Sequence, residues 1–365
     1  DRKVTIGAGA LFTVAALGLM LLYIDPESVL TALSGTDTTL VAAAAVVYIV
    51  SWPLRGLRYR GILAELGFHE RVDFLTGAVF ISQTGNLVFP ARAGDAVRAY
   101  VVKARRGIPY PSGFASLAAE RVFDLLTITM LAGVVLIGLV VTGGVDELAA
   151  TISGGVPQVS ADAVRTAVTV AAGVGAAAVV AVAAIIVSAR SDGNLVRATI
   201  LQISSDAYAD HLASVIEQFV DGVQTVAGDR GAFARVGLSS LAIWSLDVVT
   251  AIMVLAAFPD VALSLPMMVA VGFFAVSIGN LAKVLPLSPG GIGLYEAAFT
   301  AFAFGLTGGA VPAAVAFAAA VLDHAIKNLI TIAGGVISML SLNVSLTTAV
   351  EETSEVPNSP DAAQD

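Results

Sequence analysis

The stretch Pro286-Leu-Ser-Pro-Gly-Gly-Ile-Gly-Leu-Tyr-Glu296 interrupts an otherwise apolar segment. Two prolines and three glycines within a dozen residues forbid a continuous helix. We therefore expect free backbone N–H groups here and a new helix that begins near Gly293. A helix N-terminus attracts phosphate, especially beside cations such as Lys283 and Arg121. The Gly-x-Gly spacing is not that of a dinucleotide-binding loop, because no strand precedes it.

The composition around this stretch is that of an integral membrane protein. Of the 365 residues, 57% are hydrophobic and only 13% are charged, and the mean hydropathy is +0.88, well above the range of soluble domains. The chain has no cysteine and only three scattered histidines, so we expect no metal, no other cofactor and no thiol chemistry. A net charge of −9 and an excess of Arg over Lys hint at a halophilic source.

Six apolar runs are long enough to cross a bilayer, and two further segments are apolar but broken by Gly, Pro, Asn and charge. The first run precedes Asp25-Pro26-Glu27 without a small-residue cleavage site, so we expect it to be retained. The fold class is therefore an all-α integral membrane protein with six full transmembrane helices and two re-entrant broken-helix hairpins. The six runs are 4–24, 39–54 with its flanks, 113–141, 166–188, 236–258 and 312–340, and the hairpins are 72–106 and 265–306.

The two broken segments resemble each other. Gly85-Asn86-Leu87 is followed by Pro90 and Gly94-Asp95, and Gly279-Asn280-Leu281 is followed by Pro286 and Gly290-Gly291. Three crossings separate the hairpins, so the second enters from the opposite face and the pair forms an inverted repeat. Chance similarity between apolar segments is the alternative. Inverted pairs of broken helices are typical of an alternating-access site near the midplane of the bilayer.

The domain organisation follows from these segments. Residues 1–345 form a single transmembrane domain with repeat-like units at about 72–141 and 265–340, and 346–365 form an acidic disordered tail. The segment from about 193 to 230 has apolar residues at helical spacing, which predicts an amphipathic helix on the inner surface. A partner helix in a homo-oligomer is the competing interpretation.

The distribution of charge predicts the orientation. Fifteen of the 19 Lys and Arg residues, Arg55 and Arg58 among them, fall in inner loops when both termini are placed inside. Arg165 alone falls outside, where the loops carry acids instead. The positive-inside rule therefore predicts a multi-pass protein of the cell membrane with both termini in the cytoplasm.

Ionisable residues inside apolar segments are costly and are functional candidates by default. Glu120, Arg121 and Asp124 lie within two turns of one expected helix, where they form a translocation site or merely neutralise one another. The last expected helix places Asp323 four residues before Lys327, and His324 four residues before Asn328. Asp247 lacks a local partner, so it is expected either to meet a Lys or Arg from another helix or to reach water near the helix end.

A basic mouth lies at the expected inner interface. Arg92, Asp95 and Arg98 are followed by Lys103, Arg105 and Arg106. Ordinary positive-inside anchoring explains such a cluster, and capture of anionic lipid headgroups is the sharper alternative.

Three motifs carry a resemblance to a known family. They are Gly85-Asn86 with Pro90-x-x-x-Gly94-Asp95, Ala119-Glu120-Arg121-x-x-Asp124, and Leu285-Pro286-x-x-Pro289-Gly290-Gly291-x-Gly293-x-x-Glu296. Together they resemble the membrane domain of lysylphosphatidylglycerol synthases, over most of the chain and in the form of its free-standing archaeal relatives.

The resemblance implies movement of lipids with charged headgroups between leaflets, or action beside polyprenyl-phosphate sugar pathways, where relatives can be fused to a glycosyltransferase. The family commonly has an Arg where this chain has His324, which puts the headgroup charge preference in doubt. No aminoacyl-transferase domain is recognised in these residues, so lysine transfer is not carried over.

The sequence thus predicts a lipid flippase or scramblase that binds a phosphate-containing or otherwise anionic headgroup between the hairpins, without nucleic acid and without catalytic residues. Transport would be downhill or coupled to a proton. The alternatives are a membrane-embedded transferase acting on a lipid phosphate with Glu120 or Asp124 as base, and a non-catalytic partner of a glycosyltransferase. The expected binding and translocation residues are Asn86, Arg92, Asp95, Arg98, Glu120, Arg121, Asp124, Asn280, Lys283, Pro289, Gly290, Gly291, Tyr295, Glu296, Asp323, His324 and Lys327.

Overall fold

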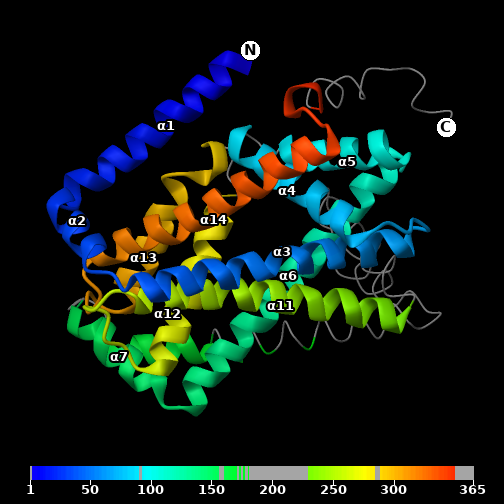
Figure 1. Cartoon of the computed structure of the whole chain (residues 1–365). Helices are drawn as coiled ribbons and strands as arrows, with labels where there is room; N and C mark the ends of the chain where they lie inside the picture. The colour runs from blue at the N-terminus through cyan, green and yellow to red at the C-terminus, as the bar shows by residue number, and fades with distance from the viewer. Residues whose placement is uncertain are drawn as a thin grey trace, which may run out of the picture.

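The computed structural model describes residues 2–89, 93–155, 160–170, 172, 173, 176, 180, 229–283 and 288–349. Throughout these residues the regular structure is helical (Figure 1), which confirms the predicted all-α class. The elements are α1 (Arg2–Tyr23), α2 (Pro26–Ser34), α3 (Thr38–Glu65), α4 (Val72–Val88), α5 (Ala93–Arg106), α6 (Tyr110–Val141), α7 (Gly144–Gly155), α11 (Arg230–Ala256), α12 (Leu265–Ala282), the 3-10 turn η2 (Pro289–Gly291), α13 (Leu294–Leu306) and α14 (Ala313–Leu342).

Five described helices are long and apolar enough to cross a membrane: α3, α6, α11, α12 and α14. The end of α1 and the whole of α2 meet at a 90° bend and give a sixth span if they are counted together. Helix α12 is the first arm of the second expected re-entrant hairpin, yet its 18 residues are long and apolar enough to cross a membrane on their own. The number of spans and the re-entrant nature of the hairpins stay predictions.

Several predicted segments lie outside the described residues. These are most of the run 166–188, the amphipathic segment at about 193–230 except for its last two residues, and the tail 346–365 beyond its first turn.

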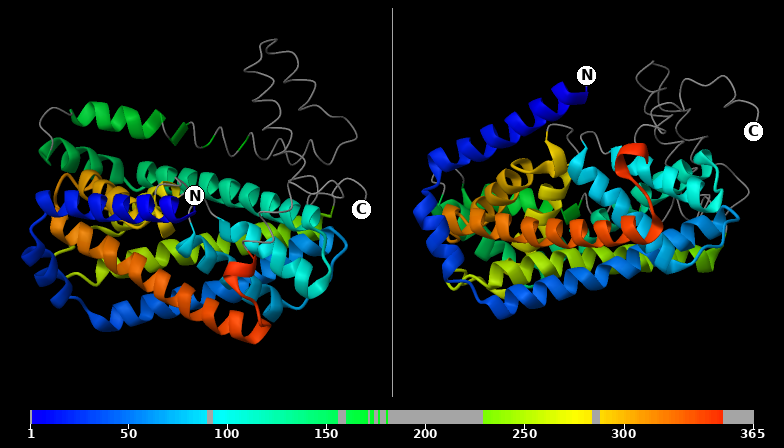
Figure 2. Two further views of the ribbon diagram at one scale, coloured as in Figure 1. Left: turned by 90° about the horizontal axis from the view of Figure 1, so that it is seen from above. Right: turned by 45° about the horizontal axis from the view of Figure 1, so that its top comes forward.

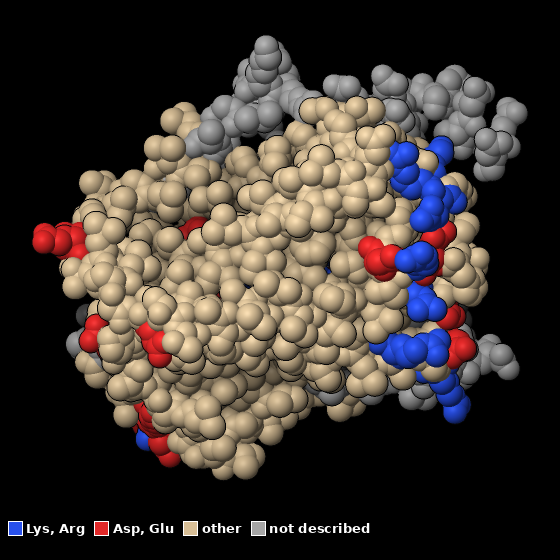
Figure 3. Space-filling model, in the orientation of Figure 1, with Lys and Arg blue, Asp and Glu red and all other residues tan. Residues whose placement is uncertain are grey.

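Helices α3 and α11 pack side by side in opposite directions (Figures 1 and 2). The N–H of Asp37, which caps the start of α3, donates to the carbonyl oxygen of Ala257 at the end of α11, at 2.8 Å. One end of the bundle therefore holds the start of α3, and the opposite end holds the start of α11. Figure 3 shows Lys and Arg gathered at one end of the visible face, with an uncharged belt between it and the acidic end. Such a belt is what a bilayer requires.

The two hairpins enter the bundle from opposite ends. Helix α4 follows the end of α3, whereas α12 follows the end of α11, and each packs against its own second arm, α5 or α13. Their breaks meet inside the bundle: a Cβ atom on Gly290 would lie 2.9 Å from Cδ2 of Leu87. The positive φ of 63° at Gly290 is a further reason for glycine there. That the hairpins descend from a repeat stays a prediction.

Helix α14 packs its backbone directly onto α4. A Cβ atom on Gly334 would lie 2.1 Å from the Phe80 ring, and one on Gly335 would lie 1.9 Å from Oγ1 of Thr84. The Thr84 hydroxyl donates to the carbonyl oxygen of Thr331 at 3.0 Å, across 247 residues of sequence. Small residues and hydroxyl bonds are the usual means of holding helices together in a bilayer.

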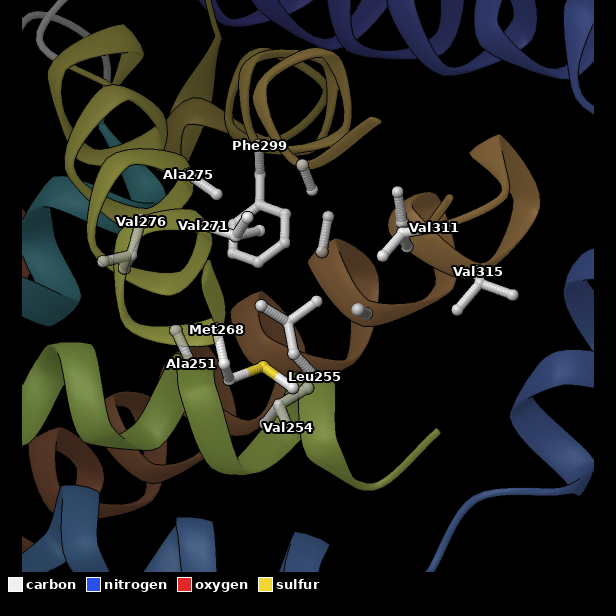
Figure 4. Close-up of a cluster of buried hydrophobic side chains, with 14 of the residues drawn as sticks. Ala251, Val254, Leu255, Met268, Val271, Ala275, Val276, Phe299, Val311 and Val315 are labelled. Atoms are coloured by element: carbon white, nitrogen blue, oxygen red, sulfur yellow. The ribbon is translucent and has the colours of Figure 1, made fainter. Parts of the chain in front are cut away.

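Each hairpin has its own apolar cluster, where hairpin 1 is formed by α4 and α5 and hairpin 2 by α12 and α13. The cluster of hairpin 2 joins α11, α12, α13 and α14, with Leu255, Phe299 and Val311 buried at its centre (Figure 4). The cluster of hairpin 1 includes Trp52 and Leu75, likewise buried. With both hairpins fixed in this way, the charged residues at their breaks are held in defined positions.

Candidate functional site

A cavity of about 580 Å³ lies where the two hairpin breaks meet. Leu87 and Phe89 line it from the first break, and Gly290 and Gly291 from the second. Its other walls come from α3, α4, α6, α11, α12 and α14. The polar lining residues are Tyr48, Trp52, Arg55, Gln83, Asn86, Glu120, Arg121, Asp124, Trp244, Asp247, Ser277, Asn280, Lys283, Ser288, Lys327, Asn328 and Thr331.

The hairpin-1 cluster, which we define as Arg58, Asp95, Arg98, Glu120, Arg121 and Asp124, is a closed set of ion pairs. Glu120 accepts from two arginines: Nη2 of Arg58 lies 2.7 Å from its Oε1, and Nη1 of Arg98 lies 2.6 Å from its Oε2. Arg58 also reaches Asp124 at 2.6 Å. Both arginine side chains are at most 2% exposed. Buried guanidinium groups need such partners, since an unpaired buried charge is very costly.

The remaining arginine of the cluster faces two acids. Arg121 lies 2.8 Å from Asp95 and 3.7 Å from Asp124. The Asn86 side-chain amide donates to Asp95 at 3.1 Å, and the Trp244 indole N–H donates to Asp124 at 2.8 Å. The local interaction predicted between Arg121 and Asp124 is thus the longest of these ion pairs, and the strong partners come from α3 and α5.

The hairpin-2 cluster, which we define as Asp247, Lys283, Asp323 and Lys327, is less evenly paired. The Lys327 ammonium lies 3.0 Å from Asp247 and 2.9 Å from Asp323. Asn280 donates to Asp247 at 2.9 Å, and the Tyr295 hydroxyl donates to Asp323 at 2.5 Å. The cationic partner that the sequence analysis expected for Asp247 from another helix is therefore Lys327.

Both carboxylate oxygens of Glu296 have partners, one in its own hairpin and one on α14. Its Oε2 accepts from the Gly293 N–H at 2.6 Å, and its Oε1 lies 2.6 Å from Nδ1 of His324. Helix α13 does begin directly after Gly293, as predicted, but Glu296 caps it from within. The Gly293 N–H is therefore not open to phosphate. That other backbone N–H groups of this stretch bind phosphate stays a prediction.

Two cavity-lining cations, Arg55 and Lys283, form no ion pair within the described part of the chain. The Arg55 guanidinium lies 5.5 Å from the Trp52 ring centroid, and the Lys283 ammonium lies 4.7 Å from that of Tyr295. Aromatic faces attract cations weakly, by about 0.5–2 kcal/mol, and leave their charge available to a ligand.

The structure divides the predicted site residues into two groups. Nine line the cavity: Asn86, Glu120, Arg121, Asp124, Asn280, Lys283, Gly290, Gly291 and Lys327. Seven lie behind it or beside it: Asp95, Arg98, Pro289, Tyr295, Glu296, Asp323 and His324. Arg92 lies outside the described residues.

Sequence reasoning missed two arginines of the site. Arg55 and Arg58 were assigned to an inner loop, but α3 continues through them to Glu65, so that assignment is wrong. The signal was present in the spacing of Tyr48, Trp52, Arg55 and Tyr59, which all lie on one helical face. A span count based on apolarity stops before the first arginine and overlooks this face.

Comparison with known proteins shows which family this architecture belongs to. Residues 6–335 match the family described as the lysylphosphatidylglycerol synthase transmembrane region. The chain belongs to this family. Its motif Ala119-Glu120-Arg121-x-x-Asp124 supplies half of the hairpin-1 cluster. At the motif glycine Gly94, a Cβ atom would lie 2.0 Å from the Ser82 carbonyl oxygen, so only glycine lets α5 approach α4 this closely.

Two relatives of this lysylphosphatidylglycerol synthase-type membrane domain are informative. Glycosyltransferase AglD of Haloferax volcanii, an archaeal halophile, is 66% identical over 359 residues, which cover 97% of the chain but 57% of that protein. A UPF0104 membrane protein of Methanothermobacter thermautotrophicus is 28% identical over 269 residues, 73% of the chain and 74% of the relative. The chain therefore spans little more than half the length of AglD. The halophilic composition agrees with the source of this relative.

Proposed function

We propose that this membrane domain carries a lipid with a phosphate-containing headgroup between the two leaflets of the cell membrane. The observation that carries the proposal is the position of the cavity. It lies where two hairpins from opposite ends of the bundle meet, and it is lined by ionisable groups from both clusters. A polar site that both ends of a membrane protein approach through broken helices is the arrangement that alternating access requires.

The size and chemistry of the cavity support the same proposal. About 580 Å³ is within the range of pockets for small ligands, about 300–1,000 Å³, and accommodates a headgroup. Burying ionisable groups at bilayer depth costs several kcal/mol each. Arg55 and Lys283 have no carboxylate partner within the described residues, so a bound anion offsets that cost.

Leaflet exchange in proteoliposomes tests the proposal. Fluorescent phospholipid and polyprenyl-phosphate probes are compared in vesicles that contain wild-type protein, the Lys283→Gln variant or no protein. The matched control is Arg71→Gln, because the Arg71 side chain is 80% exposed and pairs only with Asp73 among the described residues. We expect wild type and Arg71→Gln to accelerate exchange equally and Lys283→Gln to lose most of it. Exchange no faster than in empty vesicles, for every probe and under imposed ion gradients, would rule the transport function out.

A second candidate is support of a glycosyltransferase, and the match to AglD favours it. That relative is named a glycosyltransferase and is nearly twice as long as the matched region. In this role the domain would hold a lipid phosphate for sugar transfer by another domain or partner. Sugar transfer to a polyprenyl phosphate that depends on the domain, in vesicles where leaflet exchange is absent, would favour this candidate over transport.

A further inference from the structure

The cavity contains an excess of hydrogen-bond donors without partners. Within the described residues, several side chains that line it carry unpaired buried atoms, among them Nε1 of Trp52, Nε of Arg55 and the hydroxyl oxygens of Ser277 and Ser288. Among the described residues that line the cavity, Asn86 contributes the one unpaired atom that can only accept, its Oδ1. Buried donors without partners are costly, so this wall is complementary to a ligand rich in acceptor oxygens. Phosphate, with its charge and its several oxygens, fits that description.

These donors come from two parts of the chain. Trp52 and Arg55 belong to α3, whereas Ser277, Lys283 and Ser288 belong to α12 and the hairpin-2 break. Arg121 and Lys283 are the two cations that the sequence predicts to attract phosphate. In the structure Arg121 is occupied by Asp95 at 2.8 Å, and Arg55 is the cation left available.

Another part of the wall is apolar, and two of its residues are exposed. Leu125 and Ile128 line it from α6, and Ile278 and Leu281 line it from α12. Leu125 is 57% exposed and Leu281 is 61% exposed, although both line the same cavity as the buried charges. Because α6 and α12 are both apolar enough to span the membrane, this face lies against hydrocarbon.

We infer that the anionic headgroup binds between Arg55 and Lys283 while the hydrocarbon chain of the same lipid leaves sideways between α6 and α12, over Leu125 and Leu281. This inference rests on the proposed function and adds the headgroup ligands and the lateral route. A soluble phosphate ion would bind the same two cations, but it has no hydrocarbon chain to place between α6 and α12. The occupant is thus a membrane lipid.

Photolabelling tests the route. Two lipids share one diazirine-bearing chain, and one has a phosphate monoester headgroup whereas the other is an uncharged diacylglycerol. After illumination in vesicles, mass spectrometry quantifies the label at Leu125 and Leu281. In wild type we expect the phosphate lipid to label these positions about tenfold more than the neutral lipid, the effect of one charge-assisted hydrogen bond. At Val134 and Leu340, which are 60% and 78% exposed elsewhere on the surface, both probes should label equally.

Variants locate the headgroup. Arg55→Gln and Lys283→Gln should each abolish the preference, Arg55→Lys should restore part of it, and Arg71→Gln should leave it intact. Equal labelling of Leu125 and Leu281 by the two lipids in wild type would overturn the inference. So would complete competition by millimolar inorganic phosphate, which would assign the site to a soluble anion.

The photolabelling experiment and the leaflet-exchange experiment can fail independently of each other. A phosphate preference without exchange leaves the binding route standing and removes the transport function. Exchange without the preference leaves transport standing and removes this route.

Discussion

The two charged clusters differ in how completely they satisfy their own charges. In the hairpin-1 cluster each arginine lies within 4.0 Å of a carboxylate, and three cations face three carboxylates. In the hairpin-2 cluster Lys327 takes both acids and Lys283 contacts an aromatic ring instead. Closed ion-pair networks hold helices in one arrangement, whereas an unpaired cation beside a cavity retains affinity for a ligand. We therefore propose a structural role for the first cluster and a binding role for the second.

The largest expected effect is the loss of Glu120. Glu120→Gln leaves Arg58 and Arg98 buried without their shared carboxylate, which should lower the free energy of unfolding by about 3–5 kcal/mol. Chemical unfolding in detergent, followed by tryptophan fluorescence, measures it. Asp73→Asn is the control, since that side chain is 64% exposed and its loss should have little effect. Unchanged stability in Glu120→Gln would contradict a structural role for this cluster.

The second largest loss of stability is expected from a packing change at hairpin 1. Gly94→Ala places a methyl group 2.0 Å from the Ser82 carbonyl oxygen and 2.4 Å from the Asn86 backbone nitrogen. Backbone atoms cannot rotate away, so we expect a loss of about 1–3 kcal/mol of stability. Gly138→Ala on α6 meets nothing within 4 Å and should be neutral or stabilising by up to about 1 kcal/mol. Thermal unfolding of the Gly94→Ala and Gly138→Ala variants measures the difference. Equal unfolding temperatures for the two variants would show that α4 and α5 separate easily.

At hairpin 2 the loss of one acid should cost less. In Asp247→Asn, Lys327 keeps Asp323 at 2.9 Å, so the expected loss is about 1–2 kcal/mol, that of one charge-assisted hydrogen bond. The same unfolding assay compares it with Glu120→Gln. A cost as large as that of Glu120→Gln would erase the distinction between the clusters.

The smallest effect on stability is expected for Lys283. Because Lys283→Gln removes no ion pair that the described residues show, the free energy of unfolding should change by less than about 1 kcal/mol. Leaflet exchange should nevertheless fall sharply in this variant. A large loss of stability would move Lys283 into the structural group and leave the cavity without its assigned cation.

Local features of this fold could be predicted from the sequence. Apolar length located α3, α6, α11 and α14, and proline and glycine located both hairpin breaks, because each depends on neighbouring residues only. The pairing of Asp323 with Lys327 follows from helical spacing. The Gly293-x-x-Glu296 cap was equally local, and its spacing could have revealed that Glu296 is occupied.

The rest depends on contacts between distant segments. Nothing near Arg58 in sequence indicates that it meets Asp124, 66 residues away. The role of Arg55 could not be predicted for a related reason. Helix α3 continues beyond its apolar part, where Gly56 packs onto Thr76 of α4. Span prediction uses average polarity and cannot detect a polar helical turn that neighbouring helices bury.

The bond between Thr84 and Thr331 also fixes an order of events during synthesis. Helix α4 reaches the membrane 247 residues before the segment of α14 that completes its packing. At about 5–20 residues per second, hairpin 1 waits about 12–50 s with Thr84 and the face of α4 that packs against Gly334 and Gly335 uncovered. The newly inserted hairpin must therefore persist as an incomplete intermediate, and insertion factors or lipids that shield it in that interval would set the yield of folded protein.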